Sequence, residues 1–490
     1  MKTTTIVSLA AACMAAVPVA VSAADGGDFA ALRDEVRRLR ETYEKRIEAL
    51  ERRLAEAEGT AARAQDAAAT AQTAASRAET RAQAGDAART PPVVAGGTPR
   101  NSESAFNPGI SLILAGTYTN LKADPSTRPY AINGFVPSGG EVGPPPRSFS
   151  LGESELAITA NIDHRFRGTM FLALPPGSDE SPKVEEAHVQ TLGLPGGFNL
   201  KFGRFLSGVG YLNEQHPHAW DFADAPLAYK AFFGGQTRGD GMQLKWLAPT
   251  DTFLEFGAEA GRSTSFPASD RNKNGIQTAA LFMHAGDDVG IEHSWRAGLS
   301  VIGTSPRDRE FSDTDSTGTT TTNKISGKSR TWIADMVWKW APGGNPSARY
   351  LKLQGEVFHR SESGSLNSDS SAGTCGGACT DTFSSRQSGW YAQAVYKFAP
   401  AWRMGLRADR LSAGRTSIGL IDNGTLAVAD LPVLAAHSPR RATAMLDWSP
   451  SEYSLVRLQF ARDRSRTGDP DNQLWLQYIV SLGAHGAHKY

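Results

Sequence analysis

The chain has 490 residues, and 51 Lys and Arg residues balance 51 Asp and Glu residues, so the formal net charge at pH 7 is zero. Proteins that bind nucleic acid usually carry an excess of basic residues that neutralises phosphates, so this balance argues against a nucleic-acid partner. Hydrophobic residues make up 40% of the chain, and beyond the N-terminal segment no run of about 18 apolar residues occurs, which excludes a bundle of membrane-spanning helices.

The N-terminal segment has the three parts of a secretory signal peptide. Lys2 supplies a positive charge, residues 6–21 are apolar, and Val21-Ser22-Ala23 resembles a signal-peptidase site. We therefore predict that residues 1–23 are a signal peptide, removed on export together with Cys13.

Residues 25–89 are predicted to form helix. Between residues 28 and 58, apolar side chains recur at steps of three and four between charged residues, which is typical of a short coiled coil. Residues 60–89 are rich in Ala, which favours helix but provides no large side chains for a core. We predict that this segment lies in the periplasm and joins subunits; the alternatives are a single solvated helix and an arm that contacts the cell wall. Residues 90–104 are rich in Pro and Gly and are predicted to be a linker.

From residue 105 onwards the pattern has a period of two, which is typical of β-strands with one polar and one apolar face. Trp332, Met336 and Trp340 share one face of such a segment, whereas Asp335 and Lys339 share the other. Sixteen segments of this kind are predicted, at 109–121, 148–162, 165–174, 184–192, 198–204, 239–248, 252–261, 276–285, 289–301, 329–341, 349–361, 387–398, 402–413, 439–448, 453–463 and 472–482.

The connections between these segments alternate between short and long. Long polar connections are predicted at, among others, 205–238, 302–328, 362–386 and 414–438. An even number of strands with short turns at one end and long loops at the other is the organisation of an outer-membrane barrel, and about sixteen strands leave a water-filled lumen. We therefore predict that residues 105–490 form an all-β transmembrane barrel of about 16 antiparallel strands, preceded by the N-terminal α-helical coiled-coil segment.

The connection at 205–238 is the longest and contains many aromatic residues. A loop of this composition is poorly suited to lie in solvent, so we expect it to fold into the barrel and bury Tyr211, Trp220, Phe222 and Phe232. It would then narrow the channel and determine its selectivity.

The face opposite the apolar stripe is predicted to line the lumen. Its basic members exceed its acidic members by three, and basic pore linings favour anions. The alternative is that opposite charges neutralise one another across the lumen. The predicted basic residues are Lys201, Lys245, Arg296, Lys339, Lys352, Arg403, Arg407 and Arg457, and the acidic residues are Glu255, Glu259, Asp335, Glu356 and Asp409.

Two groups of His residues are candidate metal ligands. His216 and His218, with Asp221 nearby in the long connection, combine imidazole and carboxylate groups that suit Zn²⁺; the alternative is that these His residues pack or form hydrogen bonds. His485 and His488 near the C-terminus are a second candidate pair, unless the tail is simply unstructured.

Cys375 and Cys379 lie in a loop-like stretch of the exported chain. In an oxidising compartment this spacing predicts a local disulfide that braces the loop, because a zinc site would need two further ligands at suitable spacing. Motifs for hydrolases, zinc proteases or phosphate-binding loops are missing, so we predict no enzymatic activity and no cofactor other than the zinc considered above.

An exported helical segment, a linker and a sixteen-stranded barrel together resemble the phosphate-selective (O/P-type) porin superfamily of Gram-negative bacteria, over about residues 105–490. Three stretches more specifically resemble outer-membrane proteins described as zinc-regulated, TonB-dependent receptors. They are Phe202-Gly-Arg-Phe205 with Gly210-Tyr-Leu-Asn-Glu-Gln-His-Pro-His-Ala-Trp-Asp221, Trp246-Leu-Ala-Pro-Thr-Asp251, and Leu476-Gln-Tyr-Ile-Val-Ser-Leu-Gly-Ala-His-Gly-Ala-His488. The resemblance implies a trimer.

The sequence thus predicts a porin-like channel in the outer membrane that passes small solutes or ions and mildly favours anions. It predicts membrane lipid and two further copies of the chain as partners. The alternatives are a zinc-related uptake protein and a structural anchor of the cell envelope.

Overall fold

The structure is a computed structural model that describes residues 108–139, 142–152, 154–175 and 181–483. These residues belong to one of the two units into which the chain divides, Glu103–Tyr490. The predicted signal peptide (1–23), helical segment (25–89) and linker (90–104), and the His485 and His488 pair, lie outside the described residues and stay predictions.

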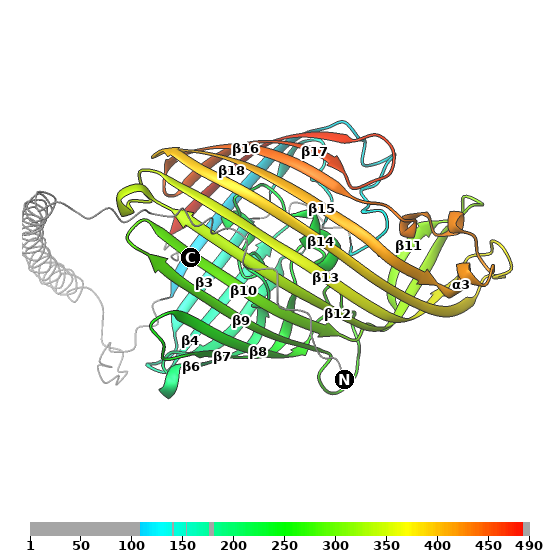
Figure 1. The fold of residues 1–490 in the computed structure, drawn as a ribbon, viewed down its shortest axis with the longest axis horizontal. Helices are drawn as coiled ribbons and strands as arrows, with labels where there is room; N and C mark the ends of the chain where they lie inside the picture. The colour runs from blue at the N-terminus through cyan, green and yellow to red at the C-terminus, as the bar shows by residue number, and fades with distance from the viewer. Residues whose placement is uncertain (1–107, 140–141, 153, 176–180, 484–490) are drawn as a thin grey trace, which may run out of the picture. The chain divides into compact units, whose positions relative to one another are not determined.

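The described residues form a closed antiparallel β-barrel (Figure 1). β1 (Gly109–Leu121) pairs with β18 (Asp471–Gly483), which closes the barrel. β2 (Ser148–Leu151) and β3 (Ser154–Asn161) both pair with β1 and together form one interrupted strand of the wall.

A second interrupted strand consists of β10 (His293–Thr304) and β11 (Arg309–Thr314), which both pair with β12 (Thr320–Trp340). The wall of the described barrel therefore has sixteen strands, and the predicted fold class is confirmed. The remaining strands are β4 (Phe166–Leu174), β5 (Lys183–Thr191), β6 (Phe198–Leu206), β7 (Arg238–Leu247), β8 (Phe253–Arg262), β9 (Thr278–Val289), β13 (Tyr350–Ser368), β14 (Cys379–Ala399), β15 (Trp402–Ile418), β16 (Arg440–Ser451) and β17 (Ser454–Arg464).

Helices are few and short among the described residues. They are the α-helices α2 (Leu227–Phe233) and α3 (Gly419–Asp422) and the 3₁₀-helices η2 (Pro195–Gly197), η3 (Pro217–Ala219), η4 (Pro342–Gly344), η5 (Val428–Asp430) and η6 (Pro432–Leu434). In the part of the chain that the structure describes, no helix has the length and apolar character needed to cross a lipid bilayer.

Three of the predicted long loops are wrong in extent. Much of 302–328 and 362–386 is strand, because β11 lies within the first range and β12, β13 and β14 extend beyond the ends predicted for their segments, whereas in 414–438 only the end of β15, up to Ile418, is strand. Ser and Thr residues are frequent there, and some of them pair across the ladder, such as Ser363 with Ser384. The outward faces of these extensions are polar and only scattered inward residues, such as Ile325 and Leu366, are apolar, so a regular apolar alternation could not reveal them. The long strands reach furthest at the end that carries the long connections (Figure 1).

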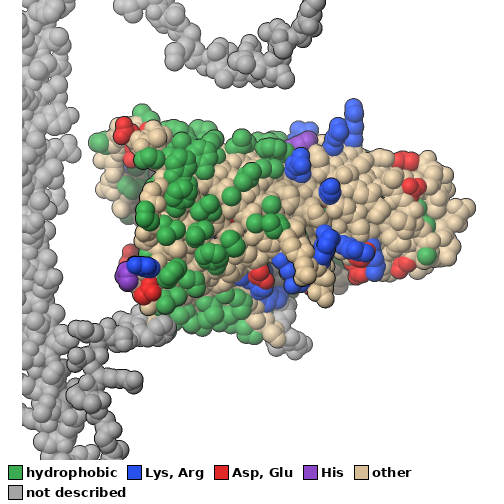
Figure 2. All heavy atoms as spheres, turned by 90° about the horizontal axis from the view of Figure 1, so that it is seen from below, with side chains coloured by type: hydrophobic (Ala, Val, Ile, Leu, Met, Phe, Trp, Pro, Cys, Tyr) green, Lys and Arg blue, Asp and Glu red, His purple; other side chains and the backbone are tan. Residues whose placement is uncertain are grey.

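The outer surface of the barrel carries an apolar belt. Along β12 the outward side chains of Trp332 and Met336 are 46% and 54% exposed, whereas the inward Thr331 and Asp335 are 1% and 5% exposed. Figure 2 shows that hydrophobic side chains cover the part of this face near the short turns, while the part near the long connections is polar. Trp475 also points inward, so apolar residues lie on both faces of the last strand.

The inside of the barrel is packed with side chains. One hydrophobic cluster joins the connection between β6 and β7 to inward residues such as Ile333, Phe358 and Tyr391. A second cluster lies under the long connections and contains Phe266, Ile325, Leu366, Leu420 and Leu434.

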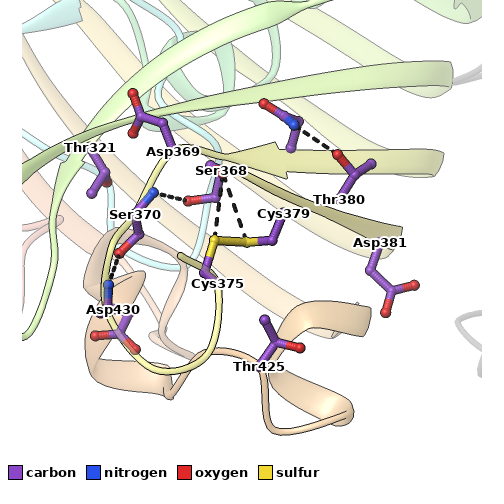
Figure 3. Close-up of a disulfide and its surroundings, with 12 residues drawn as sticks. Thr321, Ser368, Asp369, Ser370, Cys375, Cys379, Thr380, Asp381, Thr425 and Asp430 are labelled. Atoms are coloured by element: carbon purple, nitrogen blue, oxygen red, sulfur yellow. Dashed lines mark hydrogen bonds between the residues drawn. A yellow bond between two sulfur atoms is a disulfide. The ribbon is translucent and has the colours of Figure 1, made fainter. Parts of the chain in front are cut away.

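The disulfide between Cys375 and Cys379 lies beside the second cluster (Figure 3). Both sulfur atoms approach the backbone carbonyl of Ser368, at 3.7 and 3.8 Å. The predicted pair is thus a bridge within the connection between β13 and β14, where it braces the turn.

Candidate functional site

The connection between β6 and β7, residues 207–237, lies inside the barrel; we call it the inner loop. All seven residues of α2 are buried, and the inner loop shares the first hydrophobic cluster with the wall. Asn213 joins the two ends of the inner loop, because its side-chain amide donates to the carbonyls of Ser207 (2.7 Å) and Thr237 (2.8 Å). Tyr211, Trp220, Phe222 and Phe232 are each at most 7% exposed, as expected for a loop that folds inward.

An apolar contact anchors α2 to the wall. Phe232 is fully buried and stacks on Phe358 of β13, with ring centroids 5.6 Å apart and planes 5° from parallel. Phe135 meets Phe232 edge to face at 5.7 Å, and the Arg360 guanidinium lies 5.1 Å from the ring centre. Burial of an aromatic side chain with such contacts contributes several kcal/mol, so this contact is a main attachment of the inner loop.

A second anchor is the carboxylate of Glu356, which points inward from β13. It accepts hydrogen bonds from the backbone N–H groups of Tyr211 (3.2 Å) and Leu212 (3.1 Å) and from the hydroxyl groups of Tyr229 (2.9 Å) and Tyr391 (2.6 Å). The preceding Gly210 has φ of 71°, and a Cβ atom there would collide with this carboxylate. The close approach therefore requires glycine.

Asp224 of the inner loop is the centre of a buried ion cluster. Its carboxylate accepts hydrogen bonds from Lys230 (2.7 Å), Arg407 (3.0 Å), Arg441 and Gln459 (3.2 Å). Burial disfavours the charged carboxylate, but Arg441, Lys230 and Arg407 outweigh this effect and hold the pKa of Asp224 well below its usual value. The charge of Asp224 is thus needed to compensate three buried cations.

Asp221 was predicted to join His216 and His218 as a metal ligand, and this prediction is wrong. Its carboxylate instead accepts hydrogen bonds from Lys352 (2.9 Å), Gln393 (3.0 Å) and Arg403 (3.2 Å). Burial works against ionisation, but Lys352 and Arg403 lower the pKa of Asp221 to about 2. Proximity in the sequence misled the prediction, because the chain turns between the two sites at η3 (Pro217–Ala219).

His216 lies among three buried glutamates. Its Nδ1 is 3.2 Å from Oε2 of Glu155 and 3.4 Å from Oε2 of Glu185, and its Nε2 is 2.8 Å from Oε1 of Glu186. His218 Nδ1 lies 3.0 Å from the other oxygen of Glu155. Burial opposes a charged imidazole, but the three carboxylates outweigh it and raise the pKa of His216 well above its usual value.

These glutamates were missed in the sequence for a specific reason. Glu185 and Glu186 are neighbours in β5, and neighbours in a regular strand point to opposite faces. The pairing of β5 with β4 shifts register between Phe171 and Leu172, so that Glu185 has no partner and occupies a β-bulge. Both side chains are consequently buried, at 5% and 8% exposure. The sequence feature that indicates such a bulge is the pair of consecutive glutamates, Glu185 and Glu186, in an otherwise alternating segment.

The predicted lumen residues turn inward, but opposite charges meet most of the cations. Lys245 lies 3.2 Å from Glu214 and 3.3 Å from Glu255, and Arg457 lies 2.9 Å from Asp447. Lys352 and Arg403 share Asp221, and Arg407 contacts Asp224 and Asp409. Arg296 lies 5.2 Å from the ring centre of Tyr211, and Lys201 lies 5.4 Å from the ring centre of Phe205. Lys339 is on the inward face of β12, on the same side as Asp335. This is the neutralising arrangement rather than an unpaired basic ring.

Comparison with known proteins places the chain in a family. No family model matches it. An Aquifex aeolicus (strain VF5) protein described as "Uncharacterized protein" is 30% identical over 413 residues, which cover 79% of this chain and 81% of the relative. The chain belongs to the same family as this protein.

Solved structures similar to this chain include Pseudomonas putida OprB at high pH, with 14% identity and a TM-score of 0.47 over 76% of this chain and 94% of that one. The outer membrane channel DcaP of Acinetobacter baumannii has 12% identity and a TM-score of 0.45 over 78% and 99% of the two chains. The anion-selective porin from Comamonas acidovorans has 10% identity and a TM-score of 0.44 over 77% and 100%.

Proposed function

We propose that this protein is an outer-membrane channel of the porin type for small solutes or ions, narrowed by the inner loop. The closed wall of sixteen strands satisfies backbone hydrogen bonds without an open edge, and the apolar belt provides the surface that lipid requires. Short turns at one end and long connections at the other support an orientation with the short turns in the periplasm. Membrane lipid is then the first partner of the chain.

The observation that carries the proposal is the attachment of the inner loop to opposite parts of the wall. Glu186 of β5 contacts His216, Glu356 of β13 contacts Tyr211, and Gln459 of β17 contacts Ala223 at 2.9 Å. A connection held on several sides of the barrel fills much of the lumen, and we infer that solutes pass only through narrow paths beside it. We therefore expect a small conductance.

The pairing of lumen charges determines the expected selectivity. The eight predicted basic residues favour anions, but the carboxylates beside most of them cancel much of the field that an ion in the lumen would feel. We infer a permeability ratio of chloride to potassium only modestly above one.

Planar-bilayer recording of the purified full-length chain tests this function. The informative variant replaces residues 207–237 with Asn-Gly, because Leu206 and Arg238 are register partners that a two-residue hairpin turn can join. We expect small steps for the unaltered chain and larger steps for this variant. Asp240→Asn, on the outer surface, is the control and is expected to keep the small steps.

Two results would contradict the proposal. If neither the unaltered chain nor the shortened variant conducts, although both migrate as folded barrels before heating, the barrel is not a channel. If both conduct equally, the inner loop is not the constriction.

A further inference from the structure

A cluster of donor atoms lies where the inner loop meets β3 and β5. The His216 Nδ1 atom is 3.2 Å from Oε2 of Glu155 and 3.4 Å from Oε2 of Glu185. One ligand atom from each of these residues lies within 4.8 Å of the other two, and all three residues are buried. In a tetrahedral zinc site with ligands at about 2.0–2.1 Å, ligand atoms are about 3.3–3.4 Å apart. The two distances from Nδ1 match that spacing.

Two of these ligand atoms contact each other but form no hydrogen bond of good geometry. Oε2 of Glu155 and Nδ1 of His216 are fully buried and 3.2 Å apart, in residues that are 0% and 8% exposed, and neither makes a hydrogen bond in the described structure. A buried polar atom that loses water without gaining a partner costs free energy, so native structures rarely leave one unsatisfied. A cation between the two atoms would satisfy both.

The surrounding groups orient these donors. Glu186 Oε1 lies 2.8 Å from Nε2 of His216, so in a metal-bound, neutral imidazole the hydrogen would be on Nε2 and would be donated to Glu186, which leaves Nδ1, on the side of Glu155 and Glu185, as the ligand atom. His218 holds the second oxygen of Glu155 at 3.0 Å. A carboxylate behind a ligating histidine is the usual outer shell of a metal site. The bulge that brings Glu185 inside is also a typical device beside functional sites.

We propose that Nδ1 of His216 and Oε2 of Glu155 and Glu185 bind a divalent transition-metal ion such as Zn²⁺, with a fourth position left for water or a solute. Imidazole and carboxylate ligands suit such ions. The competing arrangement is an imidazolium of His216 held by the same carboxylates without a metal. The metal site goes beyond the channel function and does not depend on it; a bound ion would fasten the inner loop to β3 and β5.

Zn²⁺ binding to the purified full-length chain, freed of metal by a chelator, tests the proposal by titration calorimetry. Loss of an outer-shell partner typically lowers metal affinity about 10- to 100-fold, so we expect that range for His218→Ala and a larger loss for Glu185→Gln. Glu214→Gln is the matched control, because Glu214 lies in the same loop but contacts Lys245 at 3.2 Å. Its affinity should equal that of the unaltered chain.

Co²⁺ offers a second measurement that does not depend on affinity. A four-coordinate site gives intense visible absorption, which Glu185→Gln or, if that variant does not fold, Glu155→Gln should abolish. Failure of the unaltered chain to bind micromolar Zn²⁺, or equal binding by Glu185→Gln, overturns the proposal in favour of the imidazolium. Conductance recorded with chelator present tests the channel function separately.

A second feature lies on the outer face, where arginine residues oppose one another across neighbouring strands. Arg386 pairs with Arg415, and Arg410 pairs with Arg440. All four are exposed, and in the described part of the chain none forms an ion pair with a carboxylate. Like charges directly opposite each other destabilise a sheet, so an anion between them would relieve the repulsion.

The position of these arginines indicates the anion. Arg410 is the register partner of Trp390, an outward residue that is 40% exposed at the edge of the apolar belt. Aromatic residues at such an edge mark the level of lipid headgroups. Figure 2 shows Lys and Arg side chains gathered along the border between the apolar belt and the polar end. We also propose that these arginines bind the phosphate groups of membrane lipids.

Binding of fluorescent lipid A to the detergent-solubilised chain tests this second proposal. Each basic residue near a membrane surface contributes about fivefold in affinity, so Arg386→Gln with Arg415→Gln should weaken binding about 25-fold. Arg204→Gln is the control, because Arg204 is exposed but already lies 2.6 Å from Asp240. Unchanged binding by the double variant overturns the proposal, and so does equal competition by millimolar inorganic phosphate, which would indicate a site for free phosphate.

Discussion

Substitution of Asp224 by Asn tests whether buried charge holds the inner loop in place. Asp224 is the carboxylate shared by Lys230, Arg407 and Arg441, and removal of one partner from a buried ion cluster typically costs about 3–5 kcal/mol. Arg407 keeps Asp409 at 3.1 Å and Arg441 keeps Asp463 at 3.7 Å, which places the expected cost near the lower limit, about 3 kcal/mol. A change of this size shifts the equilibrium between attached and released loop more than about 100-fold.

Single-channel recording measures this shift as time spent in a larger conductance state, and the temperature at which the barrel unfolds on gels measures any general loss of stability. Asp240→Asn removes a chemically similar contact with Arg204, but both side chains are 40% or more exposed, so its cost is at most about 1 kcal/mol. The reasoning is refuted if Asp224→Asn shows only the small state, or if the two variants open equally often.

Four further outcomes are expected. Phe232→Ala removes the contact between α2 and Phe358 and should weaken the attachment of the inner loop by about 3–5 kcal/mol. A protease should then cut faster within residues 207–237. Cleavage as slow as in the unaltered chain would contradict this prediction. Gly210→Ala should lower the free energy of unfolding by at least about 1–2 kcal/mol because of the left-handed backbone at this position, and the collision with Glu356 adds to this loss. The variant should therefore unfold at a lower temperature. Gly275→Ala is the control, because Gly275 also has a left-handed backbone but lies at an open turn without such a collision. The pKa values of Asp221 and Asp224 are lowered in the attached loop, so their contribution to attachment is complete above about pH 4 and is lost as pH falls towards 2. The conductance should therefore rise over that interval. A constant conductance would contradict this prediction. Finally, the mass of the detergent-solubilised complex should equal that of three chains, and a monomer that still conducts would show that the predicted trimer is wrong.

The alternating pattern predicted the sixteen strands because the apolar belt outside and the mostly polar inner face of the wall select different residues at every second position. The same rule fails beyond the apolar belt. There the outward residues of β13 and β14, such as Ser365 and Thr382, are polar, and only isolated inward residues, such as Leu366 and Phe383, are apolar, so the alternation is too weak to be detected.

The site was predicted in outline but not in its partners. The aromatic content of the inner loop indicated that it folds inward, and Phe232 and Trp220 are buried as expected. His216, however, meets Glu186 from 30 positions earlier in the chain, and His218 meets Glu155 from 63 positions earlier. Such pairs depend on which strands face the loop and on a single bulge, and neither appears in a local pattern.

The unequal length of the strands gives the mouth of the barrel two different sides. β12 and β14 have 21 residues each, whereas β5 and β6 have nine, and at about 3.3 Å per residue the difference amounts to about 40 Å of strand. In the proposed orientation, with the long connections outside the cell, an antibody or a phage would touch the tall side first. Dissolved molecules reach the opening across the low side, so the approach path runs obliquely to the barrel axis.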